Sequence, residues 1–257
     1  MSPLSQVKGL IANADDFGLS SGINLGIAEA HVRSLVTNTT LMVNMPAAEE
    51  AVKLAKQLPK LGVGLHLNFT QGPPLADPAT ITSLLDEKGE FLLPNSHVVE
   101  RWEEEHLQKE LWAQVDRFLA FGLRPSHLDS HHHVHGHPKV HKLVLEAAHT
   151  LGLPVRPLKP ELLDAAGIPH PDRFIGSTYF GPDRKELLLH HLQQLQPGIT
   201  ELMFHPGHAE EHLRPRLHWV DERKIELALL LDPEVIRSIR KLEIALVNYQ
   251  VFGLCQA

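Results

Sequence analysis

The chain has 257 residues, of which 43% are hydrophobic, and its formal net charge is −7. This length suits one α/β domain spanning residues 1–257, and no apolar run approaches the roughly 18 residues that a membrane-spanning helix needs. The absence of a basic block argues against a nucleic-acid partner, and a single cysteine, Cys255, excludes an internal disulfide. With no signal-peptide pattern at the N-terminus, we expect a cytoplasmic protein.

Short apolar or β-branched segments alternate with segments of helical periodicity along the chain. The predicted strands are residues 9–13, 36–44, 62–67, 126–129, 154–157, 199–205 and 244–249. The predicted helices are residues 21–34, 47–58, 106–121, 139–151, 185–195 and 221–241. Two stretches, 70–105 and 158–184, lack clear periodicity. Strands joined by helices run parallel with right-handed crossovers, so the pattern predicts a TIM-like (β/α) barrel, seven-stranded and irregular, with an open doubly wound sheet as the alternative.

Polar side chains gather where the predicted strands end. In a parallel barrel the carboxyl ends of the strands form the rim that carries the active site. The residues at these ends are Asp15, Asp16, Asn44, His66, Asn68, His127, Asp129, His131 and His205. This concentration on one rim predicts a catalytic or binding site there.

Asp15 and Asp16 are adjacent, followed shortly by Gly18, which permits a sharp turn. Neighbouring side chains of an extended backbone point to opposite sides, so one carboxylate is expected to bind a cation while the other faces substrate. A capping or turn role for the pair is the plainer alternative.

Histidine is abundant, with nineteen in the chain, and seven of these lie between His127 and His141. Strand alternation places His127, Asp129 and His131 on one side of the backbone, which suits one metal ligand with hydrogen-bonding partners behind it. His66 alone would more often be a core residue, and for His205, which precedes Pro206, a turn role and a catalytic role are equal alternatives. Each histidine becomes a stronger candidate for the site because other polar residues are expected at the same rim.

Taken in order, these motifs resemble the YdjC-like carbohydrate deacetylases, a family that includes chitooligosaccharide deacetylases. The resemblance runs over nearly the whole chain. It rests on residues 13–20 (NADDFGLS), 36–44, 64–66 (GLH), 127–135 (HLDSHHHVH) and His205-Pro206. Gly136 stands where many relatives carry an apolar residue, which affects only the loop expected to face the substrate.

The resemblance implies a metal-dependent hydrolase that removes acetyl groups from N-acetylated amino sugars. Its metal ligands would be Asp16, His66 and His131, with Asp15 as general base and His205 as general acid. We further expect contacts to the substrate from Asn44, Asp129 and Arg156. The roles of His127, His132, His133 and His135, and the sugar itself, are left undetermined.

The expected cofactor is one divalent metal ion. Zinc and magnesium are the first expectations, with cobalt, nickel or manganese as alternatives, although two imidazoles and one carboxylate favour the transition metals over magnesium. The expected partner is a small acetylated carbohydrate, and homodimerisation is left open. Two other functions are considered: a glycosidase that uses Asp15 and Asp129 as paired carboxylates, and a non-catalytic metal-binding protein.

Overall fold

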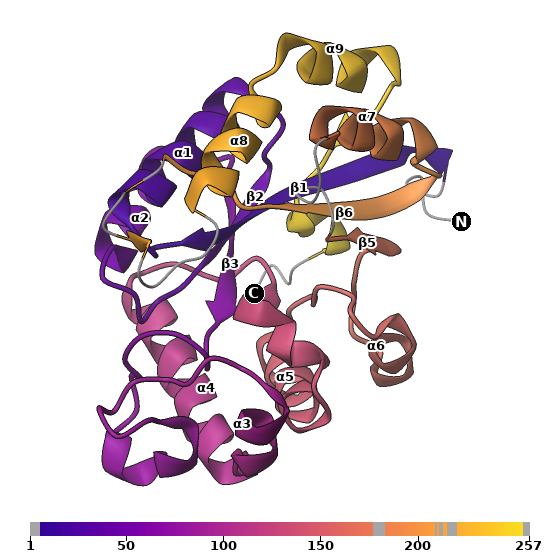
Figure 1. Ribbon diagram of the computed structural model, residues 1–257. Coiled ribbons are helices and arrows are strands. Elements are labelled where there is room, and N and C mark those ends of the chain that lie inside the picture. The colour runs from indigo at the N-terminus through magenta and orange to yellow at the C-terminus, as the bar shows by residue number, and fades with distance from the viewer. Residues whose placement is uncertain (1–5, 177–182, 209, 211–212, 215–219, 254–257) are drawn as a thin grey trace.

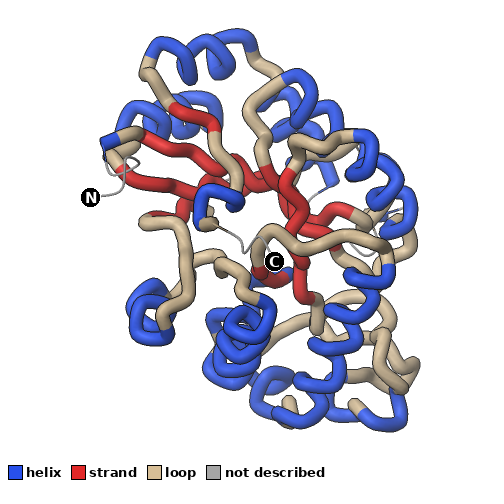
Figure 2. The backbone as a smooth tube through the Cα atoms, turned by 180° about the vertical axis from the view of Figure 1, so that it is seen from behind, coloured by secondary structure: helices blue, strands red, loops and turns tan. Residues whose placement is uncertain are grey.

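The computed structural model describes residues 6–176, 183–208, 210, 213–214 and 220–253. Within this part of the chain the strands form one sheet. They are β1 (Lys8–Phe17), β2 (Asn38–Leu41), β3 (Gly62–Leu67), β4 (Leu128–Ser130), β5 (Arg173–Ile175), β6 (Gly198–Phe204) and β7 (Ala245–Leu246). All pairings are parallel in the order β4-β3-β2-β1-β6-β5, and β7 pairs with β1. The curled sheet with helices outside it (Figures 1 and 2) confirms the α/β fold with an irregular TIM-like barrel.

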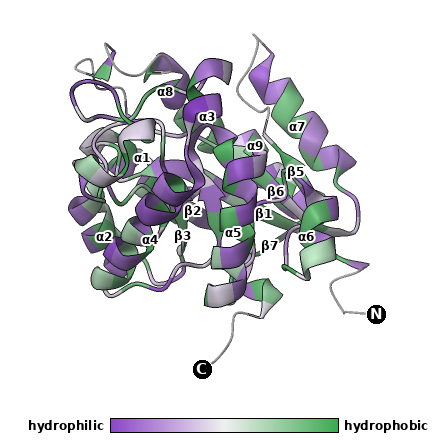
Figure 3. Cartoon of the chain, turned by 90° about the horizontal axis from the view of Figure 1, so that it is seen from below, coloured by the Kyte–Doolittle hydropathy of each residue, from purple (hydrophilic) through white to green (hydrophobic). Residues whose placement is uncertain are grey.

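The helices cover the outside of the sheet and present both hydrophobic and hydrophilic faces (Figure 3). They are α1 (Ser21–Arg33), α2 (Ala48–Gln57), α3 (Ser96–Arg101), α4 (Glu104–Ala120), α5 (Pro138–Leu151), α6 (Pro160–Ala166), α7 (Arg184–Gln194), α8 (Val220–Leu230) and α9 (Pro233–Lys241). Ser20 caps α1 by accepting from the Ile23 N–H, and Gly152 ends α5 in the left-handed conformation. No helix in the described residues is long and apolar enough to cross a membrane.

Two predicted elements are wrong. Residues 154–157 form no strand, apart from one parallel bridge between Val155 and Leu128. The fifth strand is β5, which lies inside the stretch 158–184 that showed no periodicity. The predicted helix 221–241 is two helices, because Pro233 lacks the N–H that would continue α8, and Asp232 instead caps α9 by accepting from the Glu234 N–H.

Strand register determines which side chains meet at the rim. In the β3–β4 pair, His66 is the partner of Asp129, so the two side chains lie on the same face of the sheet. In the β1–β6 pair, Ala14 is the partner of Phe204. One residue further along each strand, Asp15 and His205 therefore approach each other at the same rim.

Candidate active site

The end of β1 departs from an extended conformation at Asp16. This residue has a φ of 70°, and the register with β2 shifts between Ala14 and Phe17. The bulge corrects the expectation that the two aspartates point to opposite sides: both Asp15 and Asp16 line the same pocket. A non-glycine residue with positive φ is strained, and such residues concentrate at functional sites.

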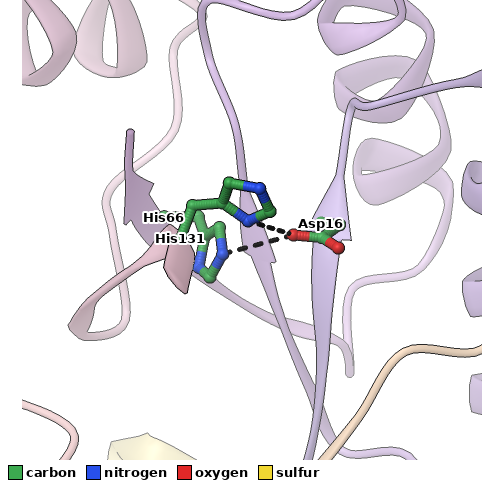
Figure 4. A group of neighbouring side chains, drawn as sticks. All are labelled: Asp16, His66 and His131. Atoms are coloured by element: carbon green, nitrogen blue, oxygen red, sulfur yellow. Dashed lines mark ion pairs between the residues drawn. The ribbon is translucent and has the colours of Figure 1, made fainter. Parts of the chain in front are cut away.

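Asp16, His66 and His131 converge from β1, β3 and the segment after β4 (Figure 4). Asp16 Oδ1 lies 3.3 Å from His66 Nε2 and 3.0 Å from His131 Nδ1. One ligand atom from each residue lies within 4.8 Å of the others, and all three side chains are buried. Asp16 Oδ1 makes no hydrogen bond although it is buried, which fits an atom whose partner is a cation.

The remaining ring nitrogens of both histidines are held by neighbours. His66 Nδ1 lies 2.7 Å from Asp129 Oδ1, and His131 Nε2 lies 2.9 Å from Gln71 Oε1. Because these acceptors hold a proton on the outer nitrogens, His66 Nε2 and His131 Nδ1 are left as the ligand atoms. This donor set of two imidazoles and one carboxylate fits one transition-metal ion.

Arg156 lies behind the aspartates, fully buried. Its Nη1 and Nη2 donate to Asp15 at 2.7 and 2.6 Å, and its Nε donates to Glu201 at 2.9 Å. Nη1 also lies 2.9 Å from Asp129 Oδ2. Glu201 in turn accepts from the Tyr249 hydroxyl at 2.6 Å. One guanidinium therefore orients carboxylates from β1, β4 and β6.

The charges in this cluster shift several pKa values. Burial alone would raise the pKa of Asp15, but Arg156 outweighs it and holds that pKa well below its ordinary value. In the same way Arg223 and then His131 outweigh burial and keep the pKa of Asp16 low. Burial opposes the charged form of His66, yet Asp129 and the other carboxylates raise its pKa to about 10. The concentrated negative charge thus favours a cation at His66, whether a proton or a metal ion.

His205 follows β6, with Nε2 4.0 Å from Asp15 Oδ2 and a side chain that is 23% exposed. Its backbone N–H donates to the buried Glu226 of α8. Burial lowers the pKa of His205 to about 4, against the opposing charges of Asp16 and Asp15. The ring is therefore neutral near pH 7 unless a neighbouring group supplies a proton.

A pocket of about 260 Å³ opens over these residues. It is lined by Asp15, Asp16, His66, His131, His132, His133, His205, Glu222, Arg223 and Glu226. The structure brings together in this lining all five residues assigned catalytic or metal-binding roles from the sequence. The sequence left the roles of His132 and His133 undetermined. It indicated no role for the lining residues of α8, because a helical pattern does not distinguish Arg223 and Glu226 from ordinary helix positions.

The three residues expected to contact substrate do not line this pocket. Asn44 donates to the carbonyl oxygens of Gln71 and Pro73 and so holds the loop after β3. Asp129 and Arg156 are fully buried behind the site. Their contacts make them positioning residues in this structure and give no support to a direct contact with substrate.

Fold and site together define a parallel α/β barrel protein whose rim carries an enclosed Asp-His-His group beside an aspartate and a histidine. The chain belongs to the family of YdjC-like proteins, whose model matches residues 9–241. A protein of Geobacillus stearothermophilus named carbohydrate deacetylase is 40% identical over 94% of this chain and 97% of its own length. A protein of Thermoanaerobacter pseudethanolicus with the same name is 36% identical over 95% of this chain and 99% of its own length.

Solved structures agree on the fold. A protein from Enterococcus faecalis, described as a candidate for cellobiose-phosphate cleavage, superposes with a TM-score of 0.90 at 32% identity, covering 95% of this chain and 98% of its own. A family 4 carbohydrate esterase from Streptomyces lividans, solved with acetate, superposes with a TM-score of 0.51 at 11% identity, covering 92% of this chain and 90% of its own. The second likeness concerns the fold alone.

Proposed function

We propose that this protein is a metal-dependent carbohydrate deacetylase that hydrolyses the acetamide of an N-acetylated amino sugar. The observation that carries the proposal is the convergence of Asp16, His66 and His131 in a pocket that also holds Asp15 and His205. The relatives named carbohydrate deacetylase, matched over nearly their full lengths, support the same reaction class.

The proposed metal ligands are Asp16 Oδ1, His66 Nε2 and His131 Nδ1, which suit zinc, cobalt, nickel or manganese better than magnesium. A divalent ion held there polarises an acetamide carbonyl and makes water more acidic. Asp129 and Gln71 keep the two imidazoles in the tautomers that this requires.

Asp15 is the proposed general base. Arg156 donates to both of its oxygens and keeps the carboxylate ionised, and Asp15 is among the residues that line the pocket. It receives a proton from the attacking water. Asp15 then passes this proton to the neighbouring His205, whose Nε2 lies 4.0 Å from Asp15 Oδ2, and His205 donates it to the departing sugar nitrogen. The products are acetate and the protonated amine of the sugar, which balance the acetamide and one water.

The glycosidase alternative has less support from the geometry. Glycosidase carboxylates lie about 5 to 9.5 Å apart across a cleft and both face the sugar. Asp129 is instead fully buried, and it shares Arg156 Nη1 with Asp15. A non-catalytic metal-binding role leaves the adjacent Asp15 and His205, and the pocket around them, without a purpose.

The test is acetate release from N-acetylated chitooligosaccharides by metal-loaded and chelator-treated protein, with metal content measured by elemental analysis. We expect activity to disappear with the metal and to return when zinc or cobalt is restored. Asp16→Asn should bind less metal while keeping its circular dichroism spectrum. Full activity at a metal content near zero refutes the proposal, and cleaved glycosidic bonds without free acetate would favour the glycosidase.

A further inference from the structure

Two polar side chains of α4 are buried although the proposed reaction makes no use of them. Glu110 and Gln114 are fully buried, one helical turn apart on the face of α4 that also buries Leu107, Leu111 and Phe118. A carboxylate among apolar side chains is costly, and burial raises the pKa of Glu110 although the hydrogen bonds that it accepts oppose the shift. Buried polar groups of native proteins are hydrogen-bonded, so their partners indicate what these two side chains hold in place.

Both side chains hold the segment that follows β3, the strand beside which α4 packs (Figure 1). Gln114 Oε1 accepts from the Asn68 N–H at 2.9 Å, and Gln114 Nε2 donates to the Asn68 carbonyl oxygen. The same Nε2 donates to Glu110 Oε1 at 2.8 Å. Glu110 in turn accepts from the backbone N–H groups of Leu75 at 3.0 Å and of Ala76 at 2.9 Å. Helix α4 therefore fixes both ends of residues 68–76.

From Asn68 the hydrogen bonds continue to the rim of the barrel. Asn68 Oδ1 accepts from the N–H groups of Thr70 and Gln71, each at 3.1 Å, and Asn68 Nδ2 donates to the Gln71 carbonyl oxygen at 2.7 Å. These bonds close a tight turn at residues 68–71. Beyond it, Gln71 Oε1 lies 2.9 Å from His131 Nε2, and Thr70 Oγ1 lies 2.8 Å from His132 Nδ1. A continuous path of hydrogen bonds thus connects α4 to the imidazole of His131.

The place of the Gln71 carboxamide depends on this turn. Gln71 is only half-buried, and a long glutamine side chain keeps one conformation only where its backbone is fixed and its end is bound. The bond that it accepts from His131 Nε2 leaves Nδ1 of that ring for a cation. Outer partners of this kind orient a ligand histidine and fix its tautomer, so a loose Gln71 would leave His131 less well prepared to bind an ion.

We propose that Gln114 and Glu110 are positioning residues of the proposed metal site. By fixing the turn at residues 68–71 they hold Gln71 against His131, and this contact strengthens the binding of the ion. Neither Gln114 nor Glu110 lines the pocket, so both act through Gln71 and not by touching the ion or the substrate. The inference rests on the proposed function and goes beyond it, because it makes metal affinity depend on an outer helix.

The experiment compares Co²⁺ affinity, measured by competition with a coloured chelator, between the wild type and three variants. Gln71→Met removes the contact with His131 and should weaken binding about 10- to 100-fold, the usual cost of losing the outer partner of a ligand histidine. Gln114→Met has a similar length but releases the Asn68 backbone, so it should weaken binding about 3- to 10-fold. Gln108→Met is the matched control, because Gln108 is exposed on the same helix, and it should bind Co²⁺ as the wild type does.

A double variant separates positioning from a general loss of stability. If Gln114 acts through Gln71, the protein with both Gln71→Met and Gln114→Met binds Co²⁺ no more weakly than Gln71→Met alone. Additive losses would overturn the proposal, as would a Gln114→Met protein that melts at a lower temperature but binds Co²⁺ with wild-type affinity. Glu110→Gln serves where Gln114→Met does not fold. It keeps the volume and turns one acceptor into a donor, so it should weaken binding about 2- to 5-fold, and not at all beside Gln71→Met.

One readout requires no metal ion. In metal-free protein the His131 Nε2–H, which donates to Gln71, should exchange slowly with water, as followed by nuclear magnetic resonance after isotopic labelling of histidine. Gln71→Met and Gln114→Met should both speed up this exchange, whereas Gln108→Met should not. Exchange in Gln114→Met that is as slow as in the wild type would overturn the proposal.

The two proposals fail in different ways. If the wild-type protein binds no Co²⁺ and releases no acetate, the proposed function is wrong, and exchange at His131 that depends on Gln114 would still support the positioning role. If the wild type binds Co²⁺ and releases acetate while Gln114→Met matches it in affinity and in exchange, the deacetylase stands and the positioning role is wrong.

Discussion

Replacing Arg156 with methionine tests whether this buried cation holds the site together. The guanidinium makes contacts of 2.6 to 2.9 Å with Asp15, Asp129 and Glu201, and it is fully buried. Methionine has a similar length and packs well in irregular spaces, so the variant removes the charge with little loss of volume. Three buried carboxylates then lose their shared cation.

Removing one partner of a buried ion pair costs about 3–5 kcal/mol. The cost does not triple here, because carboxylates left without a cation can take up protons. We therefore expect Arg156→Met to lower the free energy of unfolding by about 3–5 kcal/mol at pH 7. At about 2–4 °C per kcal/mol for a chain of this size, the melting temperature should fall by about 6–20 °C.

The assay is urea unfolding followed by circular dichroism, with Arg117→Met as the control. Arg117 pairs with Glu49 at 3.1 Å on the surface, so its loss should cost less than about 1 kcal/mol. Arg156 holds the pKa of Asp15 below its ordinary value of 3.8. The ion pair between them therefore contributes fully to the free energy of unfolding above pH 3.8, and this contribution is lost as the pH falls below that value. The gap between wild type and Arg156→Met should therefore be wider at pH 7 than at pH 3. A loss no larger than that of Arg117→Met would refute the role of Arg156.

Two further predictions concern residues around the pocket. His205→Gln should lower kcat about 10²- to 10⁴-fold and leave the metal content unchanged. Steady-state kinetics measure the first quantity and elemental analysis the second. A kcat near that of the wild type would rule out proton transfer by His205. Burial raises the pKa of Glu226 from 4.5 to about 7, so at intermediate pH the folded protein keeps a proton that the unfolded chain releases. The free energy of unfolding of the wild type should therefore fall as the pH rises from 4.5 to about 7. Glu226→Gln lacks this titration, and in metal-free protein the stability difference should move in favour of the variant between pH 5 and pH 8. Parallel stability curves would contradict the pKa shift.

The overall fold and the gathering of polar residues at one rim could be predicted because both follow from simple geometry, whereas the choice of Asp16, His66 and His131 as metal ligands was implied by the family resemblance and stays a proposal. Parallel strands deliver their carboxyl ends to one rim, so Asp16, His66 and His131 can be grouped although they are far apart in sequence. Strand β3 was predicted with its observed bounds, because alternating residues between Gly62 and Leu67 give a clear pattern. Strand β5 was missed since three residues are too few to show any periodicity.

Other parts of the site have no local signature. Arg156 lies in a segment with a single β-bridge, and only the folded chain shows that Asp15, Asp129 and Glu201 surround it. The positive φ of Asp16 could not be predicted either, because a positive φ is expected at glycine and not at aspartate. Sequence patterns therefore locate the rim, while the contacts that orient its side chains emerge only in three dimensions.

Among the described residues, the sheet does not close by a continuous ladder between β4 and β5, which are its two ends. In the described chain Leu128 of β4 forms one parallel bridge with Val155, and the residue after Val155 is Arg156. Its side chain contacts carboxylates on β1, β4 and β6. Ion pairs of Arg156 therefore connect β4 to β1 and β6, whereas neighbouring strands of the sheet are connected by main-chain hydrogen bonds. The arrangement of the candidate site residues and the attachment of β4 to β1 and β6 thus depend on the same side chain, so a change at Arg156 is expected to disturb both.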